Sequence, residues 1–444
     1  MVDNHEPRDA AGLKGQLPEG WTWARLGSLA DFVNGDRGAN YPTQSDRVNA
    51  GLPFINTGHI EPNGRLSHDR MDYISKVSFD KLRAGKVKPG DIVYCLRGST
   101  IGKTARNDFA EGAIASSLVI VRSKPNVSQD YLYFYLISPF GQQLVKERDN
   151  GSAQPNLSVR TLSEYPVPVP PLAEQTAIGR ILSALDDKIE LNRRMNETLE
   201  AMAQALFKSW FVDFDPVRAK AEGRDLAVAK EVARLFPSDL AAVEEGDIPA
   251  GWHFVTLSGI CEINPQRMLR KNQVAPYVDM ASIPIRGHSL DGWSKRPYGS
   301  GTRFHNGDTL LARITPCLEN GKTAYVDVLE DGEIGWGSTE YIVLRPKPPI
   351  PSEYAYCLAR SETFRTAAIQ SMTGSSGRQR VPFEAVANFN VAAPSQAVAE
   401  AFGEVVSPLF SRMKAAASES RALAEMRDAL LPRLISGEIR LVGS

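Results

Sequence analysis

A short segment ending in Gly-Lys-Thr is the part of this 444-residue chain most typical of catalysis. Residues 97–104 read RGSTIGKT and resemble a phosphate-binding loop. Such a loop needs four residues between its first glycine and the Gly-Lys pair, so that backbone amides surround the phosphates. Only three intervene here, and the related segment 321–323 (GKT) has no upstream glycine. A hairpin or loop with an exposed lysine is therefore favoured over a nucleotide site.

Other constellations of catalytic residues are missing from the sequence. The six histidines show no metal-ligand spacing, and the four cysteines lie far apart without a CxxC pair. No serine stands in a Gly-x-Ser-x-Gly motif. Residues 264–266 (NPQ) lack the second proline and the aromatic residue of an adenine-methyltransferase motif. We therefore predict no catalytic residue, no cofactor and no metal, and the chain is not expected to be an enzyme.

The composition is that of a globular chain with balanced charge. Hydrophobic residues make up 42%, and 51 Lys and Arg stand against 52 Asp and Glu. No apolar run approaches the roughly 18 residues of a membrane span, and residues 1–15 lack the apolar core of a signal peptide. These features and the scattered cysteines predict a cytoplasmic protein without a membrane partner.

The chain contains an internal repeat. Four motifs recur in the same order: residues 17–21 (LPEGW) as 248–252 (IPAGW), 89–91 (PGD) as 306–308 (NGD), 121–125 (VRSKP) as 344–348 (LRPKP), and 131–133 (YLY) as 354–356 (YAY). Because insertions separate the motifs the offset drifts, but the shared order indicates a duplication. Each copy begins with roughly 150 residues of short apolar runs between turn signals, which predicts short strands.

Each copy ends in a segment with the seam of a coiled coil, because apolar positions alternate spacings of three and four residues. The predicted helix-pairing residues are Ile178, Leu182, Leu185, Ile189, Leu199 and Leu206 in the first copy, and Phe402, Val406, Leu409, Met413, Leu423 and Leu430 in the second. We expect two helices of about 35–40 residues that pack on each other, with Asn192 and Asn196 fixing the register. Two separate amphipathic helices are the alternative.

Two further expectations concern the ends of these helices. Pro408 is expected to kink or break the second helix, and Pro432 to end it. Residues 213–247 are rich in Asp and Glu and are interpreted as a solvated connector with a short helix between 228 and 235.

Several segments together resemble the specificity subunits of type I restriction–modification systems. The most specific are residues 170–175 (PPLAEQ), 181–189 (ILSALDDKI) and 206–216 (LFKSWFVDFDP), which look like the central conserved region of that family. Residues 17–21 and 248–252 look like the entries to its two target recognition domains, and residues 430–439 (LLPRLISGEI) like its C-terminal end. Nearly the whole chain is covered. Residues 394–397 (PSQA) depart from the Pro-Leu-x-Glu-Gln form, which affects only the local helix cap.

The resemblance implies an α+β fold of two duplicated mixed α/β target recognition domains, separated and joined by two long antiparallel coiled-coil helices. It implies that each recognition domain reads one half of a split site in double-stranded DNA, and that the helices set the spacing. Two modification subunits would methylate adenine, and a restriction subunit would add ATP-dependent cleavage. The predicted boundaries are 1–16 for a flexible N-terminal tail, 17–171 and 248–394 for the recognition domains, 172–247 for a central helical region with its linker, and 395–444 for a C-terminal helical region.

Base reading needs Arg, Lys, Gln or Asn side chains, and two glycine-containing loops, 150–156 and 374–380, offer them. The candidate DNA-binding residues are Gln154, Asn156, Arg378, Gln379 and Arg380 in these loops, with Lys103, Lys322 and Arg97 near the Gly-Lys segments. Arg37, Arg267 and Arg313 are weaker candidates, expected to be solvated. The candidates for binding the modification subunits are the acidic connector and the helix residues Asp186, Asp187, Arg193 and Arg194.

Two other interpretations stay open. One is a coiled-coil scaffold whose heads bind proteins, because residues 17–171 and 248–394 carry little net charge. The other is a nucleotide-hydrolysing enzyme built on residues 98–104. Steep salt dependence would distinguish DNA binding from both.

Overall fold

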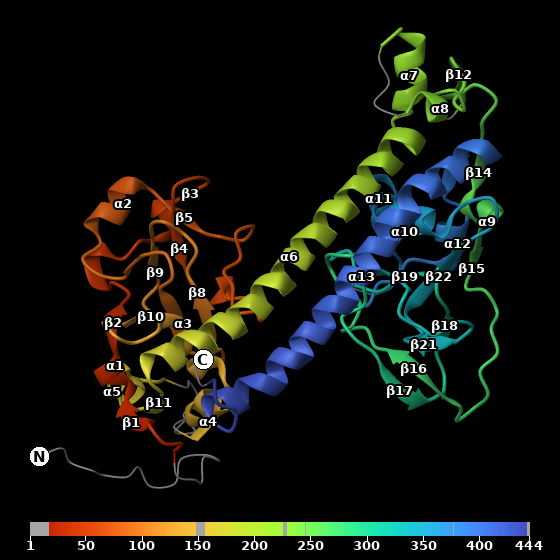
Figure 1. The fold of residues 1–444 in the computed structure, drawn as a ribbon. Coiled ribbons are helices and arrows are strands. Elements are labelled where there is room, and N and C mark those ends of the chain that lie inside the picture. Colours follow the sequence, from red (N-terminus) through yellow and green to blue (C-terminus); the bar gives the residue numbers. More distant parts are fainter. Residues whose placement is uncertain (1–16, 148–155, 225–228, 245, 376, 442–444) are drawn as a thin grey trace, which may run out of the picture. The chain divides into compact units, whose positions relative to one another are not determined.

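The computed structural model describes residues 17–147, 156–224, 229–244, 246–375 and 377–441 (Figure 1). They form two compact units. The first contains the chain up to Ile189 together with the residues from Ala422 onward, and the second runs from Glu190 to Arg421. The predicted flexible tail, 1–16, and the candidate Gln154 lie outside the described residues. Helices and strands contribute to both units, which confirms the predicted α+β class, and none of the described helices is long and apolar enough to cross a bilayer.

The first unit combines two sheets with short helices. Its strands are β1 (Thr22–Arg25), β2 (Ala30–Asn34), β3 (Arg47–Val48), β4 (Leu52–Ile55), β5 (Tyr73–Ile74), β6 (Lys86–Val87), β7 (Ile92–Cys95), β8 (Thr104–Arg106), β9 (Gly112–Ile114), β10 (Leu118–Ser123) and β11 (Pro166–Val169). Its short helices are α1 (Leu26–Leu29), α2 (Lys76–Lys81), α3 (Gln129–Ile137), α4 (Pro139–Glu147) and α5 (Val159–Ser163). The sheet orders are β2-β10-β7-β8 and β3-β5-β4-β9-β6, and β1 pairs with β11.

The second unit repeats this arrangement. Its strands are β14 (His253–Thr256), β15 (Cys261–Ile263), β16 (Val274–Val278), β17 (Ser294–Pro297), β18 (Thr302–Phe304), β19 (Thr309–Ala312), β20 (Thr323–Tyr325), β21 (Gly335–Gly337), β22 (Tyr341–Pro346) and β23 (Asn390–Ala393). Its short helices are α9 (Leu257–Ile260), α10 (Ser352–Arg360), α11 (Glu362–Gln370) and α12 (Phe383–Ala387). The orders β15-β22-β19-β20 and β17-β16-β21-β18, with β14 paired to β23, follow those of the first unit, so the predicted duplication is confirmed. Among the described residues β3 has no counterpart, which leaves β17 as an edge strand.

The repeated motifs form the same contacts, each with a buried aspartate, in both units. Arg122 Nε donates to Asp91 Oδ1 at 2.7 Å, and Arg345 Nη1 donates to Asp308 Oδ1 at 2.7 Å. The lysines two residues on, Lys124 and Lys347, donate to backbone carbonyls in α1 and α9 at 3.0 and 2.8 Å. Each motif therefore ties the end of an inner strand, β10 or β22, to the short helix beside it.

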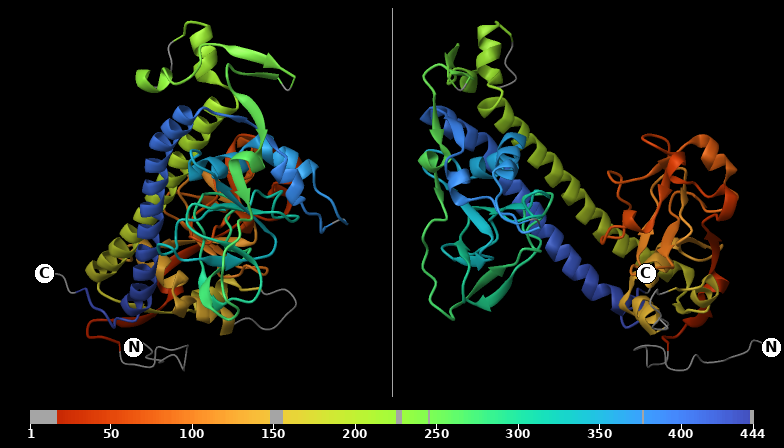
Figure 2. Two further views of the ribbon diagram at one scale, coloured as in Figure 1. Left: turned by 90° about the vertical axis from the view of Figure 1, so that its right-hand side faces the viewer. Right: turned by 180° about the vertical axis from the view of Figure 1, so that it is seen from behind.

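Two 40-residue helices run antiparallel, as predicted: α6 (Leu172–Phe211) and α13 (Gln396–Ile435). Within the first unit Arg427 Nη1 donates to Asp186 at 2.8 Å, and within the second Asn196 Nδ2 donates to the Met413 carbonyl at 3.2 Å. Partner numbers thus fall along α13 as they rise along α6, and Figure 2 shows the two helices side by side in each unit.

The expected break at Pro408 and the expected end at Pro432 are wrong, while a kink at Pro408 stays a prediction. The helix continues through Pro408 and ends only at Ile435, three residues after Pro432. Val406 and Phe410 are both buried on either side of Pro408. Because this packing stabilises helical backbone on both sides, it outweighs the hydrogen bond that proline cannot donate.

The connector contains a short helix between residues 228 and 235, as expected, and is otherwise more ordered than a solvated segment. It contains α7 (Asp215–Ala221), α8 (Lys230–Ala233) and the antiparallel pair β12 (Leu240–Val243) and β13 (Gly246–Pro249). Phe236 packs edge-to-face on Trp210 at 5.1 Å between ring centres, and Phe214 on Trp252 at 5.9 Å. The acidic composition concealed these apolar residues, which anchor the connector in the core of the second unit.

Candidate nucleic-acid interface

The Gly-Lys-Thr segment of the first unit connects the strands of a β-hairpin. β7 and β8 pair antiparallel, with Tyr94 opposite Thr104, and the Gly102 amide donates to the Cys95 carbonyl at 3.0 Å. Gly98 and Gly102 have φ of +84°, a conformation that glycine adopts without strain. A phosphate-binding loop instead joins a strand to a helix. The predicted hairpin is therefore confirmed, and the alternative of a nucleotide site loses its support. Lys103 is exposed at the end of the turn.

Three candidates of the first unit line one surface pocket of about 520 Å³. Arg37, Arg97 and Asn156 line it, together with Asn34 at the end of β2 and with Leu157 and Ser158 before α5. Arg97 and Asn156 pair as an antiparallel bridge, and the Leu157 amide donates to the Leu96 carbonyl at 2.9 Å. This pairing brings the end of the loop 150–156 beside the hairpin. The exposed side chains of Arg37, Arg97 and Asn156 offer cationic and amide groups to a polyanion.

The second unit repeats the pairing with different side chains. Arg380 bridges to Ile314 and Thr373, and the Val381 amide donates to the Arg313 carbonyl at 3.0 Å. The Arg380 guanidinium also binds both oxygens of Glu340, with Nη2 2.6 Å from Oε1. Arg380 is therefore held by an ion pair, whereas Arg378 in the same loop is exposed. Gln379 is half-buried, and its carbonyl accepts from the Thr315 amide at 3.0 Å.

Three other cations of the second unit make internal contacts. Lys322 Nζ donates to the Met280 carbonyl at 2.7 Å. Arg267 is only 9% exposed and lies 2.7 Å from Asp308, so the expectation that it is solvated is wrong. Arg313 lies over the Phe383 ring at 3.8 Å, and burial lowers the pKa of its guanidinium. Types and spacing alone did not reveal these partners.

The helix-pairing residues lie in two separate cores. In the second unit Phe402, Val406 and Met413 are buried, and Leu199, Leu206 and Leu409 pack against the same cluster. In the first unit Ile178 and Leu182 share a cluster with Leu431 and Leu434, and Leu430 packs against it. Leu185, Ile189 and Leu423 are half-buried. The buried Asn192 donates to the Ala416 carbonyl and to Glu419, and Asn196 to the Met413 carbonyl, which places both amides in the seam.

Sequence reasoning missed a buried carboxylate that joins three distant segments of the first unit. Glu174 accepts from Trp21 Nε1 at 3.0 Å, from Arg440 Nε at 2.8 Å and from the Leu441 amide at 3.2 Å. Burial opposes its ionisation, but the hydrogen bonds from Arg440 and Trp21 prevail and lower its pKa. The PPLAEQ motif contained this glutamate, but its partners are far away in sequence. In the second copy Val398 and Ala399 stand in place of Glu174 and Gln175, and both are apolar and buried.

The helix charges proposed to bind modification subunits already have partners within the chain. Asp186 binds Arg427 at 2.8 Å and Asp187 binds Arg65 at 2.9 Å. Arg193 and Arg194 both contact Glu190, at 2.8 and 2.7 Å. These pairs leave less charge available to another protein than the sequence suggested.

These features define the class of the protein. Two copies of one α/β head are attached to a pair of long helices, and their exposed Arg, Lys and Asn side chains gather on hairpins and loops. Over the described ranges, no group of three His, Cys, Asp or Glu side chains is placed to hold a metal. This is the design of a two-headed recognition subunit.

Comparisons with known proteins identify the family. Residues 18–201 match the type I restriction modification DNA specificity domain. The chain is 26% identical to the HindI specificity subunit of Haemophilus influenzae, over 87% of this chain and 94% of that one, and 25% identical to the MjaIX specificity subunit of Methanocaldococcus jannaschii, over 96% and 95%. The crystal structure of the S subunit from M. genitalium has the same fold, with a TM-score of 0.57 at 16% identity over 96% of this chain and 98% of that one. The predicted resemblance to the specificity subunits of type I restriction–modification systems is therefore confirmed.

Proposed function

We propose that this chain gives a type I restriction–modification complex its DNA sequence specificity. Each head would read one half of a split site in double-stranded DNA, and the helix pair would set the spacing between the halves. The observation that carries the proposal is the repeated pairing of a loop with a hairpin, Asn156 with Arg97 and Arg380 with Ile314. Two heads built alike but with different side chains at this position suit two different half-sites.

The candidate contacts divide into two kinds. Arg97, Lys103, Asn156 and Arg378 are exposed and would contact bases or phosphates directly. Arg380, Gln379 and Lys322 make internal contacts and would orient the loops around them. Gln154 stays a proposed contact because it belongs to the same loop as Asn156. The proposed reading heads keep the boundaries 17–171 and 248–394, with 172–247 and 395–444 as the helical regions.

The partners follow from the same proposal. Two modification subunits would bind the helical regions and methylate one adenine in each half-site, which they would turn out of the duplex. A restriction subunit would add ATP-dependent cleavage. The complex would work in the cytoplasm, in keeping with the four unpaired cysteines Cys95, Cys261, Cys317 and Cys357.

Methylation mapping tests this function. The chain would be co-expressed with the modification subunit encoded beside it, in a host without other DNA methylation, and methyladenine mapped by long-read sequencing. We expect a split motif with one methylated adenine in each half, absent when this chain is omitted. A continuous motif would contradict the two-headed account. A stable complex without methylation would favour a coiled-coil scaffold whose heads bind proteins.

A further inference from the structure

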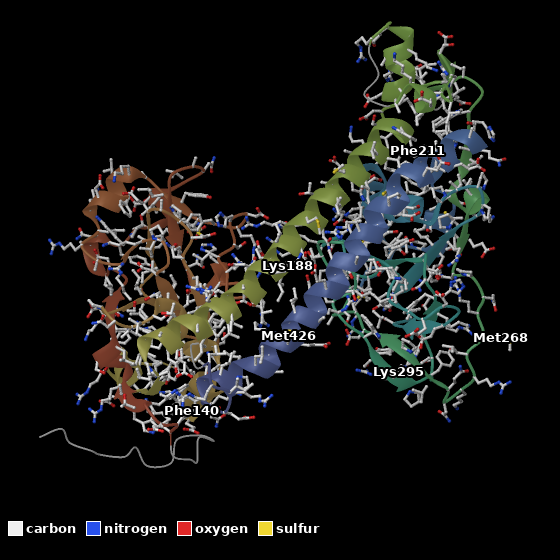
Figure 3. The ribbon with its side chains drawn as sticks, viewed as in Figure 1. Phe140, Lys188, Phe211, Met268, Lys295 and Met426 are labelled. Atoms are coloured by element: carbon white, nitrogen blue, oxygen red, sulfur yellow. The ribbon has the colours of Figure 1, made fainter. Side chains whose placement is uncertain are left out.

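The second unit carries an exposed basic surface that the sequence analysis did not identify. All four residues of the edge strand β17 are exposed, and so are Arg270 and Lys271 in the turn before β16. The Asn272 amide donates to the Tyr298 carbonyl at 2.8 Å, which ties this turn to the end of β17. We call Arg270, Lys271, Lys295 and Arg296 the β17 surface. Figure 3 labels Lys295 and also Met268, which is 87% exposed in the loop that leads to the turn.

The charge of this region is unlike that of its counterpart in the first unit. Residues 264–303 contain seven Lys and Arg against two Asp and Glu, whereas the corresponding residues 34–86 contain eight against six. The excess falls from five charges to three over residues 264–394, because residues 304–394 contain eight basic and ten acidic residues. Within the described chain no carboxylate lies within ion-pair distance of these four cations, and only Arg296 has an electrostatic interaction with a carboxylate, that of Asp279. The surface is therefore a local concentration of available positive charge.

Aromatic rings support the surface from beneath. The Arg296 guanidinium lies 4.4 Å from the centre of the Tyr277 ring, and Tyr277 and Tyr298 both pack on Trp336, at 4.5 and 5.4 Å. A cation held over a ring keeps its charge while losing little mobility on binding. Cations on an edge strand also prevent strand-to-strand aggregation. That role accounts for Lys295, but not for Arg270 and Lys271, which lie outside the strand.

The strand of the first unit that corresponds to β17 carries no such positive charge. There β5 holds Tyr73 and Ile74 where β17 holds Lys295 and Arg296, and β3 covers its edge. Arg47 of β3 lies over Phe54 at 4.4 Å, as Arg296 lies over Tyr277, but Arg47 also pairs with Asp72 at 3.5 Å. The free cationic edge is therefore a property of the second copy alone, and the duplicated fold does not require it.

We propose that the β17 surface binds the phosphates of the DNA backbone beside the half-site of the second head. The second head would then supply more of the electrostatic binding than the first, although both read bases. Charge complementarity carries the argument, since several neighbouring cations that no carboxylate holds in an ion pair suit a polyanion. Phosphate contacts position a protein without selecting sequence. This inference rests on the proposed function.

The test uses the full chain in complex with its modification subunits. The double variant Lys295→Gln/Arg296→Gln is compared with Lys230→Gln/Arg234→Gln, which removes the same charge from exposed positions in the connector. Fluorescence anisotropy measures binding to a duplex with the mapped split site and to an unrelated duplex, from 50 to 200 mM salt. Each phosphate contact contributes about 0.9 to the slope of log K against log salt. We expect the β17 variant to have a slope shallower by about 1.8 on both duplexes, so that salt weakens it about 12-fold less than the wild type. The control should keep the wild-type slope.

The possible results separate the proposed phosphate contact from a protein contact and from a failure of the proposed function. An unchanged slope with wild-type affinity overturns the inference. Loss of the modification subunits from the variant complex also overturns it, because the surface would then be a protein contact. A wild-type complex that binds neither duplex contradicts the proposed function itself. If the strand variant does not fold, Arg270→Gln/Lys271→Gln leaves the sheet intact, and the same reduction in slope is expected.

Discussion

Replacing Asp308 with alanine should destabilise the second unit far more than Asp91→Ala destabilises the first. Asp308 is fully buried and binds Arg267, whose side chain is 6% exposed, and Arg345. Its loss leaves the Arg267 charge buried without its ion-pair partner, which costs about 3–5 kcal/mol. Asp91 instead binds Arg122, whose side chain is 32% exposed and can turn to water. The loss of these charged hydrogen bonds costs about 1.5–3 kcal/mol.

Hydrogen exchange measured by mass spectrometry on the full chain can separate the two effects. A single melting temperature does not suffice, because two units need not unfold together. In Asp308→Ala, protected amides of β19 and β22 should exchange between about a hundredfold and several thousandfold faster, while β7 and β10 keep the wild-type rate. Asp91→Ala should show the reverse pattern with a smaller acceleration. Equal acceleration in the two variants, or none in β19, would refute the reasoning about the buried Arg267.

Three further predictions test other contacts. In Glu174→Gln the C-terminal segment should become easier to proteolyse at pH 6. Because the Glu174 pKa is lowered from 4.5, the stabilisation by the ionised carboxylate is present above pH 4.5 and is lost as the pH falls below it. The wild type should therefore lose protection from protease on acidification, whereas the protection of the variant should not change with pH. Asn192→Leu should raise the thermal stability of the second unit by about 1 kcal/mol and widen the range of spacers methylated, because a buried polar residue in a seam specifies register at a cost in stability. Arg378→Gln should reduce the slope of log K against log salt for DNA binding by about 0.9, as measured by anisotropy, without changing the melting temperature. Arg380→Gln should instead lower the melting temperature, because it removes the ion pair with Glu340 that holds its loop.

The duplication was predictable from sequence because its repeated motifs have structural roles. Asp91 and Arg122 recur as Asp308 and Arg345 since each pair forms the same contact between a buried aspartate and an arginine. Such positions tolerate few alternatives, so they remain recognisable even when the loops between them have changed length. The helix seam was predictable for a similar reason, because burial along α6 and α13 imposes the spacing of three and four residues.

The availability of individual cations was not predictable. Arg378 and Arg380 are two residues apart in one loop, but only Arg380 meets Glu340, which is distant in sequence. Arg267 likewise owes its burial to Asp308. Composition fixes the type of a side chain, whereas its partner depends on tertiary contacts that no local pattern encodes.

Two expectations from the sequence failed, one because charge was averaged over a whole head and one because a local rule for proline was applied. Summing charge over a whole head concealed the β17 surface, since the strand order that exposes it emerges only from the sheet. The rule that proline interrupts helices failed at Pro408, because packing of Val406 and Phe410 dominates there. The conformational preference of a single residue contributes little free energy, and the burial of a large apolar helix face contributes more.

The central claim is that the two heads read the two halves of a split site independently. The most direct measurement exchanges residues 17–171 for the corresponding head of a specificity subunit with a different known motif, and maps methyladenine with the same modification subunit. We predict that the half of the motif read by the first head changes to that of the donor, while the other half and the spacer stay as they were. A change in both halves, or in neither, would contradict the account.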